Sequence, residues 1–246
     1  MPITLPSLPE DTFTRQKLGE YWLHNARMEH ASIAAFARLS LELLSLGAPP
    51  DLLSQSASAQ ADEIHHAEIC FSLASHYLGE GISPWAYPGI ISWGLRRVSL
   101  AELARESFID GAIGEGVACR VAEEQSELAK DEKLSTIYTT IARDEWRHAK
   151  LGWDIVEWAL RVGNDKEKKK IEKTLHDTLS KTRLTYHLRT LSSEERTYFD
   201  SSLSDHGLMS EARYLDIRKL VYEESLERLE KMIGKREEGK SWWRRL

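Results

Sequence analysis

The chain has 246 residues, of which 41% are hydrophobic and 29% are charged, and its formal net charge is −6. This composition is typical of a globular protein with a large core, and the negative balance gives no overall attraction to nucleic acid or to an anionic membrane. Cys70 and Cys119 are the two cysteines and form no C-x-x-C motif. This excludes a disulfide framework, a zinc knuckle and a rubredoxin-type iron centre.

The beginning of the chain contains several prolines and lacks the basic and apolar regions of a secretory signal. We expect residues 2–9 to form an extended arm. No apolar run approaches the length that a membrane-spanning helix needs. A cytoplasmic protein without a transmembrane segment is therefore expected.

Four long helices are predicted in the first two-thirds of the chain. They span residues 11–46, 51–78, 99–130 and 131–162. Gly47 and Pro49-Pro50 end the first helix, and Gly163-Asn164 ends the fourth. Ser99-Leu-Ala-Glu102 has the capping-box pattern that opens a helix. All regular structure that the sequence predicts is α-helical.

The lengths of the connections predict the topology. The first two helices are joined tightly, as are the third and fourth, so each pair should form an antiparallel hairpin. Residues 79–98, with their glycines and prolines, leave one long crossover between the hairpins. We therefore expect a four-helix bundle over residues 11–163.

The remainder of the chain, residues 164–246, is predicted to be a helical extension packed on the bundle or involved in dimerisation. It begins with a lysine-rich surface helix over residues 165–188 and ends with a helix over residues 210–233. Between them we expect a short helix at Ser193 and a turn at His206-Gly207. The basic tail around Trp242-Trp243 suits a disordered end or a docking segment, and an interfacial membrane anchor is the alternative.

The sequence contains an internal repeat of residues that commonly bind metal ions. Residues 62–67 read Asp-Glu-Ile-His-His-Ala and residues 144–149 read Asp-Glu-Trp-Arg-His-Ala, with four of six positions identical. Each hexapeptide lies in the second helix of a predicted hairpin. The first helix of each hairpin supplies one glutamate upstream, Glu29 in one hairpin and Glu115 in the other.

These residues predict a site for two metal ions. The candidate ligands are Glu29, Glu63, His66, Glu115, Glu145 and His148. Residues three apart on a helix share a face, so each Glu-x-x-His pair can point into the bundle core. Four buried carboxylates would be very costly without compensation, and two divalent cations supply the missing charge. Carboxylate ligands with one imidazole per metal favour iron, with manganese or a mixed Fe/Mn pair as alternatives, over structural zinc.

Asp62 and Asp144 precede the ligand glutamates of the two hexapeptides. We expect each carboxylate to accept the Nδ1 hydrogen of the ligand histidine on the partner helix and so to fix its tautomer. The alternative is an aspartate on the helix surface.

The pattern resembles the ferritin-like di-iron carboxylate superfamily. Residues 144–148 match the Asp-Glu-x-Arg-His form of its oxygenases, and residues 62–66 match except that His65 replaces Arg. The chain looks most like the tRNA hydroxylase and ferritin-like bacterial proteins of unassigned activity. The resemblance implies a ferritin-like bundle. It also implies that either Glu63 with Glu115, or Glu29 with Glu145, bridges the irons.

The resemblance implies an oxidoreductase that uses O2 as co-substrate to hydroxylate or oxidise a small organic or lipid-like molecule. An external electron donor is then expected, and a monomer or homodimer fits the extension better than a cage. The alternatives are a ferroxidase or peroxide-reducing protein, which handles iron or peroxide, and a tRNA-modifying hydroxylase, which the acidic charge disfavours.

Several residues near the candidate ligands could serve either the function of the site or the packing of the core. Gly111, Gly114 and Gly116 flank Glu115 and favour either a π-bulge that opens space or close helix packing. Side chains that could line the site or relay electrons are more typical of core packing: Cys70, Cys119, Tyr138, Trp22, Trp146 and Trp153.

Overall fold

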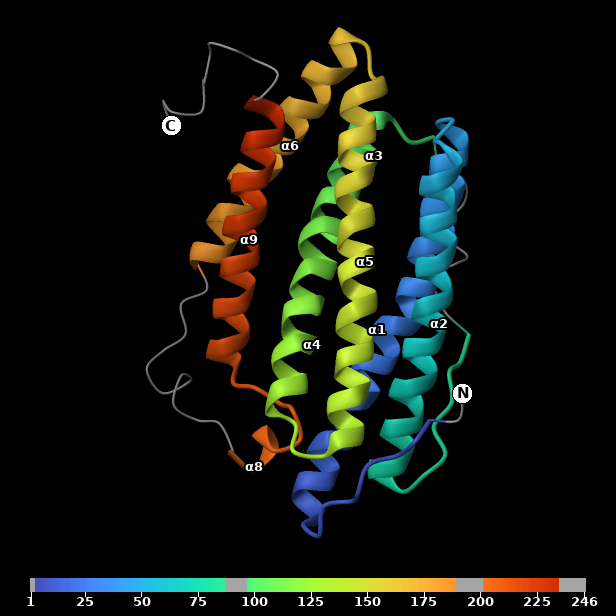
Figure 1. Cartoon of the computed structure of the whole chain (residues 1–246), viewed down its shortest axis with the longest axis vertical. Coiled ribbons are helices and arrows are strands. Elements are labelled where there is room, and N and C mark those ends of the chain that lie inside the picture. The colour runs from blue at the N-terminus through green and yellow to red at the C-terminus, as the bar shows by residue number, and fades with distance from the viewer. Residues whose placement is uncertain (1–2, 87–96, 189–200, 235–246) are drawn as a thin grey trace.

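The computed structural model describes residues 3–86, 97–188 and 201–234, and all regular elements in these ranges are helical (Figure 1). The elements are α1 (Thr12–Ser45), α2 (Pro50–Leu78), α3 (Leu100–Glu106), the π-helix η2 (Ser107–Glu115), α4 (Gly116–Leu128), α5 (Glu132–Val162), α6 (Asp165–Leu188), α8 (Ser201–Ser204) and α9 (Glu211–Gly234). The predicted all-α fold is therefore confirmed for these residues. The short helix predicted at Ser193 and the Trp242-Trp243 tail lie outside them.

Local sequence signals set the helix ends. Gly47 and Gly79 adopt left-handed backbone conformations with φ of 70° and 72°, after α1 and α2 respectively, and glycine does this without steric cost. Pro50 occupies the first position of α2, where its missing N–H is no loss. The capping box is present: Glu102 N donates to Ser99 Oγ at 3.3 Å, and Ser99 N donates to Glu102 Oε2 at 2.9 Å.

The chain forms two antiparallel helical hairpins. In Figure 1, α1 and α2 run in opposite directions, as do the α3–η2–α4 helix and α5. Helix α2 ends at one end of the bundle and α3 begins at the other, so the connection between them spans the bundle's length. The two hairpins contact each other mainly through α2 and α5. This is the predicted bundle with one long crossover.

Two apolar clusters form the bundle core. One contains Phe36 and Leu151, and the other contains Ala67 and Ile141. The two hexapeptides fall between them along α2 and α5. The polar site therefore lies at the junction of two apolar regions, which shield it from water.

The third predicted helix is interrupted by a change of helix type. Its middle, η2, is a π-helix that contains Gly111 and Gly114 and ends at Glu115. A Cβ atom built on Gly152 of α5 would lie 2.4 Å from Ala112 N and 2.7 Å from Ser107 O. Both interpretations of the glycines are thus correct in part, since the π-helix is present and its backbone packs tightly on α5.

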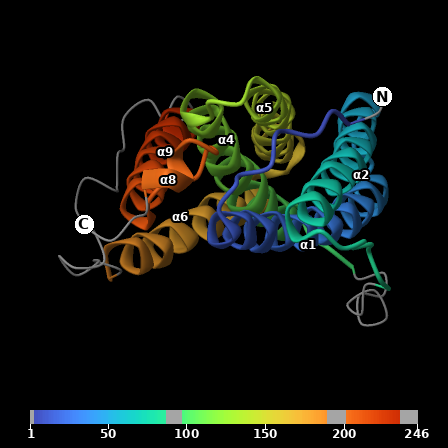
Figure 2. The same ribbon diagram turned by 90° about the horizontal axis from the view of Figure 1, so that it is seen from below.

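The extension packs against the second hairpin. Figure 2 shows α8 and α9 beside α4, on the side away from α2. Ile171 and Leu175 of α6 are fully buried, so the helix predicted to lie on the surface has one face in the core. Val221 of α9 packs near Val117 and is the nearest side chain to Gly116.

Residues 3–9 contain no helix or strand, which is compatible with the predicted arm. It is bonded to the bundle, because Ser7 N donates to Asp131 Oδ2 at 3.1 Å and Lys133 Nζ donates to Leu5 O at 2.8 Å. Across the described residues, no helix is both long and apolar enough to cross a membrane.

Candidate metal centre

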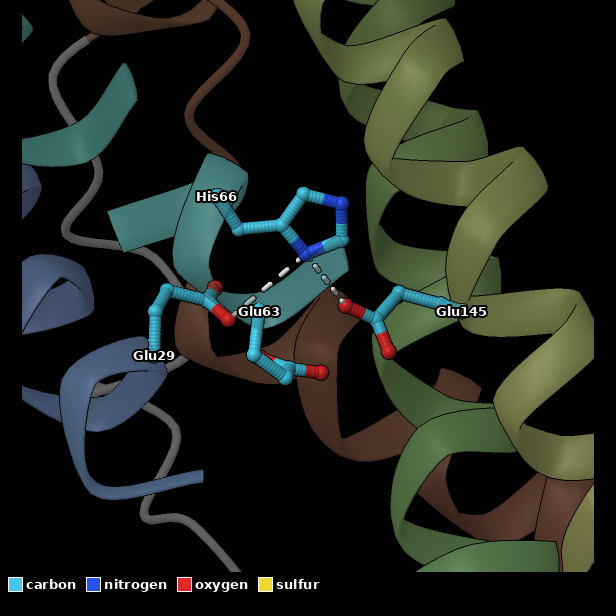
Figure 3. Close-up of side chains that lie close together, drawn as sticks. All are labelled: Glu29, Glu63, His66 and Glu145. Carbon is cyan, nitrogen blue, oxygen red and sulfur yellow. Dashed lines mark ion pairs between the residues drawn. The ribbon is translucent and has the colours of Figure 1, made fainter. Parts of the chain in front are cut away.

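All six candidate ligands converge in the middle of the bundle. The two Glu-x-x-His pairs on α2 and α5 are buried, with at most 3% of any residue exposed. Glu29 from α1 and Glu115 from the end of η2 are half-buried. Figure 3 shows Glu29 of α1 and Glu145 of α5 directed toward the His66 ring, with Glu63 of α2 beside them.

The six residues form two overlapping groups. In one group, ligand atoms of Glu29, Glu63, His66 and Glu145 all lie within 4.8 Å of one another. In the other, Glu63, Glu115, Glu145 and His148 do so. Glu63 and Glu145 belong to both groups. Each of the two bridging pairs that the resemblance implied contains one of these shared carboxylates, and the choice between bridging pairs stays a prediction.

The histidine rings present the same atom to the carboxylates. His66 Nδ1 lies 3.3 Å from Glu145 Oε1 and 3.8 Å from Glu29 Oε2, the contacts drawn in Figure 3. His148 Nδ1 lies 3.1 Å from Glu63 Oε1 and 3.3 Å from Glu145 Oε2.

These buried atoms lack hydrogen bonds. His66 Nδ1, His148 Nδ1, Glu63 Oε2 and Glu145 Oε2 have no hydrogen-bond partner among the described residues, despite the short distances. Leaving a buried polar atom unpaired costs about 1–3 kcal/mol, and more for charged groups. Four such atoms facing one small volume are what ligands of a metal ion would leave unpaired, so the residues present fit metal binding.

Protons offset part of the carboxylate charge when no metal is bound. Burial raises the pKa of Glu63 to about 8 and raises the pKa of Glu115 well above its usual range. Burial lowers the pKa values of His66 and His148, but the neighbouring carboxylates outweigh this effect and raise them to about 12 and about 10 respectively. Metal binding must therefore displace protons from this site.

Asp62 and Asp144 contact the ligand histidines across the hairpins, as predicted. Asp144 Oδ2 lies 3.3 Å from His66 Nε2, and Asp62 Oδ2 lies 3.2 Å from His148 Nε2. The predicted atom was wrong, because the rings turn Nε2, and not Nδ1, toward the aspartates. Nδ1 is thereby left facing the shared carboxylates.

Arg147 links the two aspartates, a role that the sequence analysis did not assign. Its Nη2 donates to Asp62 Oδ2 at 2.8 Å, and its Nη1 lies 2.7 Å from Asp144 Oδ1. Arg143 Nε also donates to Asp144 Oδ1, at 3.1 Å. These guanidinium groups, with the His66 ring, hold the pKa of Asp144 well below its usual range despite its burial. The signal was the arginine of Asp-Glu-x-Arg-His, three residues after Asp144.

A cavity of about 90 Å³ reaches one half of the centre. It lies between α1, the α3–η2 segment and α5, and it is lined by Glu115 and His148 but by neither Glu29 nor His66. The space that the glycines around Glu115 were predicted to open is therefore present, and Gly111 lines it. The sequence analysis did not assign a cavity role to Arg38, Glu42, Glu106, Ser107 or Asp110.

The remaining aromatic and sulfur candidates divide between core and surface. Tyr138 stacks on Trp22 with ring centroids 5.4 Å apart, and its hydroxyl donates to His206 O at 3.2 Å. Cys70, Cys119 and Trp153 are buried. These contacts fit the core-packing interpretation. Trp146 is 58% exposed, so its position does not fit core packing.

No protein-family model, curated protein or solved structure matches this chain. The geometry of the buried Glu/His cluster, which can hold metal, therefore carries the functional argument.

Proposed function

We propose that the chain is a ferritin-like di-iron protein that activates dioxygen to oxidise a small organic substrate. The observation that carries the proposal is the pair of overlapping ligand groups sharing Glu63 and Glu145. A lone Glu-x-x-His pair would support only a single site. Two copies, with a glutamate from each remaining helix, match the ligand rule of di-iron and di-manganese bundles.

One ion would be held by Glu29 and His66, the other by Glu115 and His148, and both by the shared carboxylates. When bound, two ferrous ions supply two electrons for the reduction of dioxygen. The protein holds each histidine in one tautomer, because Nε2–H donates to an aspartate and leaves Nδ1 free to bind metal. The apolar clusters on either side exclude bulk water, which limits side reactions.

The cavity supports an organic substrate. It brings a small molecule beside Glu115 and His148 without exposing the other half-site. An oxidant formed in the centre would then meet the substrate before it meets solvent.

Iron oxidation is the second candidate. Glu106 and Asp110 line the outer part of the same cavity, and carboxylates can guide ferrous ions inward by electrostatic attraction. The apolar wall between these carboxylates and the centre supports the first proposal instead.

The test combines anaerobic loading with oxygen consumption. Two ferrous ions should bind per chain, and one exposure to air should consume oxygen in proportion to the protein and then stop until an electron donor is added. Continued oxidation of many irons per chain would contradict the proposal and support the ferroxidase. If the chain binds no ferrous iron, both the proposed enzyme and the ferroxidase are contradicted. Size-exclusion chromatography should show a monomer or dimer, because a substrate-oxidising enzyme does not need the cage of an iron-storage protein.

A further inference from the structure

Three carboxylates line the cavity near Arg38, namely those of Glu42, Glu106 and Asp110. Arg38 Nε lies 3.7 Å from Glu42 Oε1, and Arg38 Nη2 lies 3.9 Å from Glu106 Oε2. Arg105 Nη2 donates to Glu106 Oε1 at 3.0 Å. Asp110, the third carboxylate, forms no ion pair within the described part of the chain. Glu42 and Glu106 thus contact arginines, whereas Asp110 has no such contact in this part of the structure.

A buried hydroxyl group in the cavity wall also lacks a partner. Ser107 is 7% exposed and lines the cavity. Its Oγ has no hydrogen-bond partner in the described ranges. Ser107 and Asp110 are three residues apart on η2, and both line the cavity that Glu115 also lines. A ligand with a polar group in the cavity would satisfy this hydroxyl.

Apolar side chains form much of the remaining wall. Its buried members include side chains from three helices: Phe36, Leu103, Leu151 and Ile155. An apolar cavity of about 150 Å³ holds benzene, so a volume of 90 Å³ accommodates roughly four non-hydrogen atoms. The cavity thus combines a short apolar interior with an anionic, hydrogen-bonding outer part.

We propose that this cavity binds a small aliphatic amine, with its ammonium group at Asp110 and Ser107 and its hydrocarbon chain directed toward Glu115 and His148. This inference rests on the proposed function, since it names the substrate class of the same centre. A carboxylate of the same length would be repelled by the Asp110 carboxylate. A neutral alcohol would satisfy Ser107 but would leave Asp110 without a cation.

Calorimetric titration with n-butylamine, n-butanol and n-butyrate tests the proposal. The full chain is used both loaded with Zn(II) and without added metal, because neither form depends on oxygen chemistry. Butylamine should bind about tenfold more tightly than butanol, the factor that corresponds to about 1.4 kcal/mol. Butyrate should bind more weakly than either.

Two variants locate the binding. Asp110→Asn should weaken butylamine about tenfold and leave butanol unchanged, whereas Asp216→Asn, at an exposed aspartate of α9 away from the cavity, should change neither. Ala35→Leu should fill the cavity from α1 and weaken both ligands. An amine bound only to zinc would be insensitive to Asp110→Asn.

Preference for butyrate, or an amine affinity unaffected by Asp110→Asn, would overturn the inference. If oxygen activation is observed but butylamine does not bind, the substrate class is wrong and the proposed function stands. If butylamine binds as expected but the centre does not reduce oxygen, the proposed function fails and the cavity is an amine site of another kind.

Discussion

The imidazole rings of His66 and His148 lie 6.1 Å apart between their centroids, and each bonds to the aspartate of the other hairpin's hexapeptide. Asp144 holds the ring on α2, and Asp62 holds the ring on α5. Each half of the centre is therefore built from both hairpins. Separation of the hairpins would dismantle both halves together.

Variants that lose a shared carboxylate should bind less metal per chain than variants that lose an unshared one. Glu63→Gln removes a member of both ligand groups, so fewer than about one metal ion per chain should remain bound. Glu29→Gln leaves the second group complete, so this variant should retain about one metal ion per chain. Elemental analysis after iron loading measures the ratio. Glu68→Gln, at an exposed position of the same helix, is the matched control. Equal losses in the two ligand variants would contradict the sharing of Glu63.

The helices and the cluster of candidate ligands were predictable because their signals are local. Gly47 and Pro50 mark a helix end and a helix start in the sequence itself, and the spacing of Glu63 and His66 fixes a shared helical face. The repeated hexapeptide then placed two such faces in one core. This reasoning needs only the period of a helix and the lengths of the connections.

The remaining features of the site depend on the rotation of each helix about its axis relative to its neighbours, which the sequence did not reveal. Helical period alone cannot decide that Glu63 and Glu145 are the shared carboxylates, because all four glutamates face the core. The orientation of the histidine rings and the reach of Arg147 to both aspartates depend on distances between helices. The cavity depends on the approach of Gly152 to η2, for which a glycine in α5 is a weak signal.

Arg147 should support one half of the centre more than the other. Asp144 retains Arg143 when Arg147 is changed, but Asp62 has no second arginine among its contacts in the described residues. Arg147→Gln should therefore weaken metal binding at the His148 half, by about 10- to 100-fold, as loss of a partner behind a ligand histidine typically does. Titration with Co(II), followed by absorption, would resolve a tight and a weakened step.

Arg143→Gln is the matched substitution, since Arg143 contacts Asp144 and, among the described residues, no other carboxylate. Its effect should fall on the His66 half. Identical two-step titrations for the two variants would show that the aspartates do not act separately.

The metal-free protein should lose stability as the pH rises. The pKa of Glu63 in the fold, about 8, lies above its unfolded value, and the pKa values of His66 and His148, about 12 and 10, do too. The folded state therefore binds more protons above pH 6.5, and its free energy of unfolding decreases with pH. Thermal unfolding at pH 6.5 and 8.5 measures this.

Bound metal should remove that dependence, because it replaces the protons. The increase in melting temperature on adding Mn(II) should therefore be larger at pH 8.5 than at pH 6.5. An increase that is the same at both pH values would mean that these groups do not exchange protons for metal.

Gly152→Ala should destabilise the fold. The new Cβ would overlap backbone atoms of η2, 2.4 Å from Ala112 N, and overpacking of this kind costs about 1–3 kcal/mol. Gly81→Ala has nothing within 4 Å of its Cβ and should stay within about 0.5 kcal/mol of the parent. Chemical denaturation of both variants measures the difference. Equal stabilities would show that η2 can move away from α5 at no cost.

The most direct test of the central claim is anomalous diffraction from crystals of the iron-loaded protein. The account predicts two iron peaks per chain: one between Glu29 and His66, the other between Glu115 and His148, with Glu63 and Glu145 contacting both. Each iron should bind the Nδ1 atom of its histidine. A single peak, or two peaks that share neither carboxylate, would contradict it.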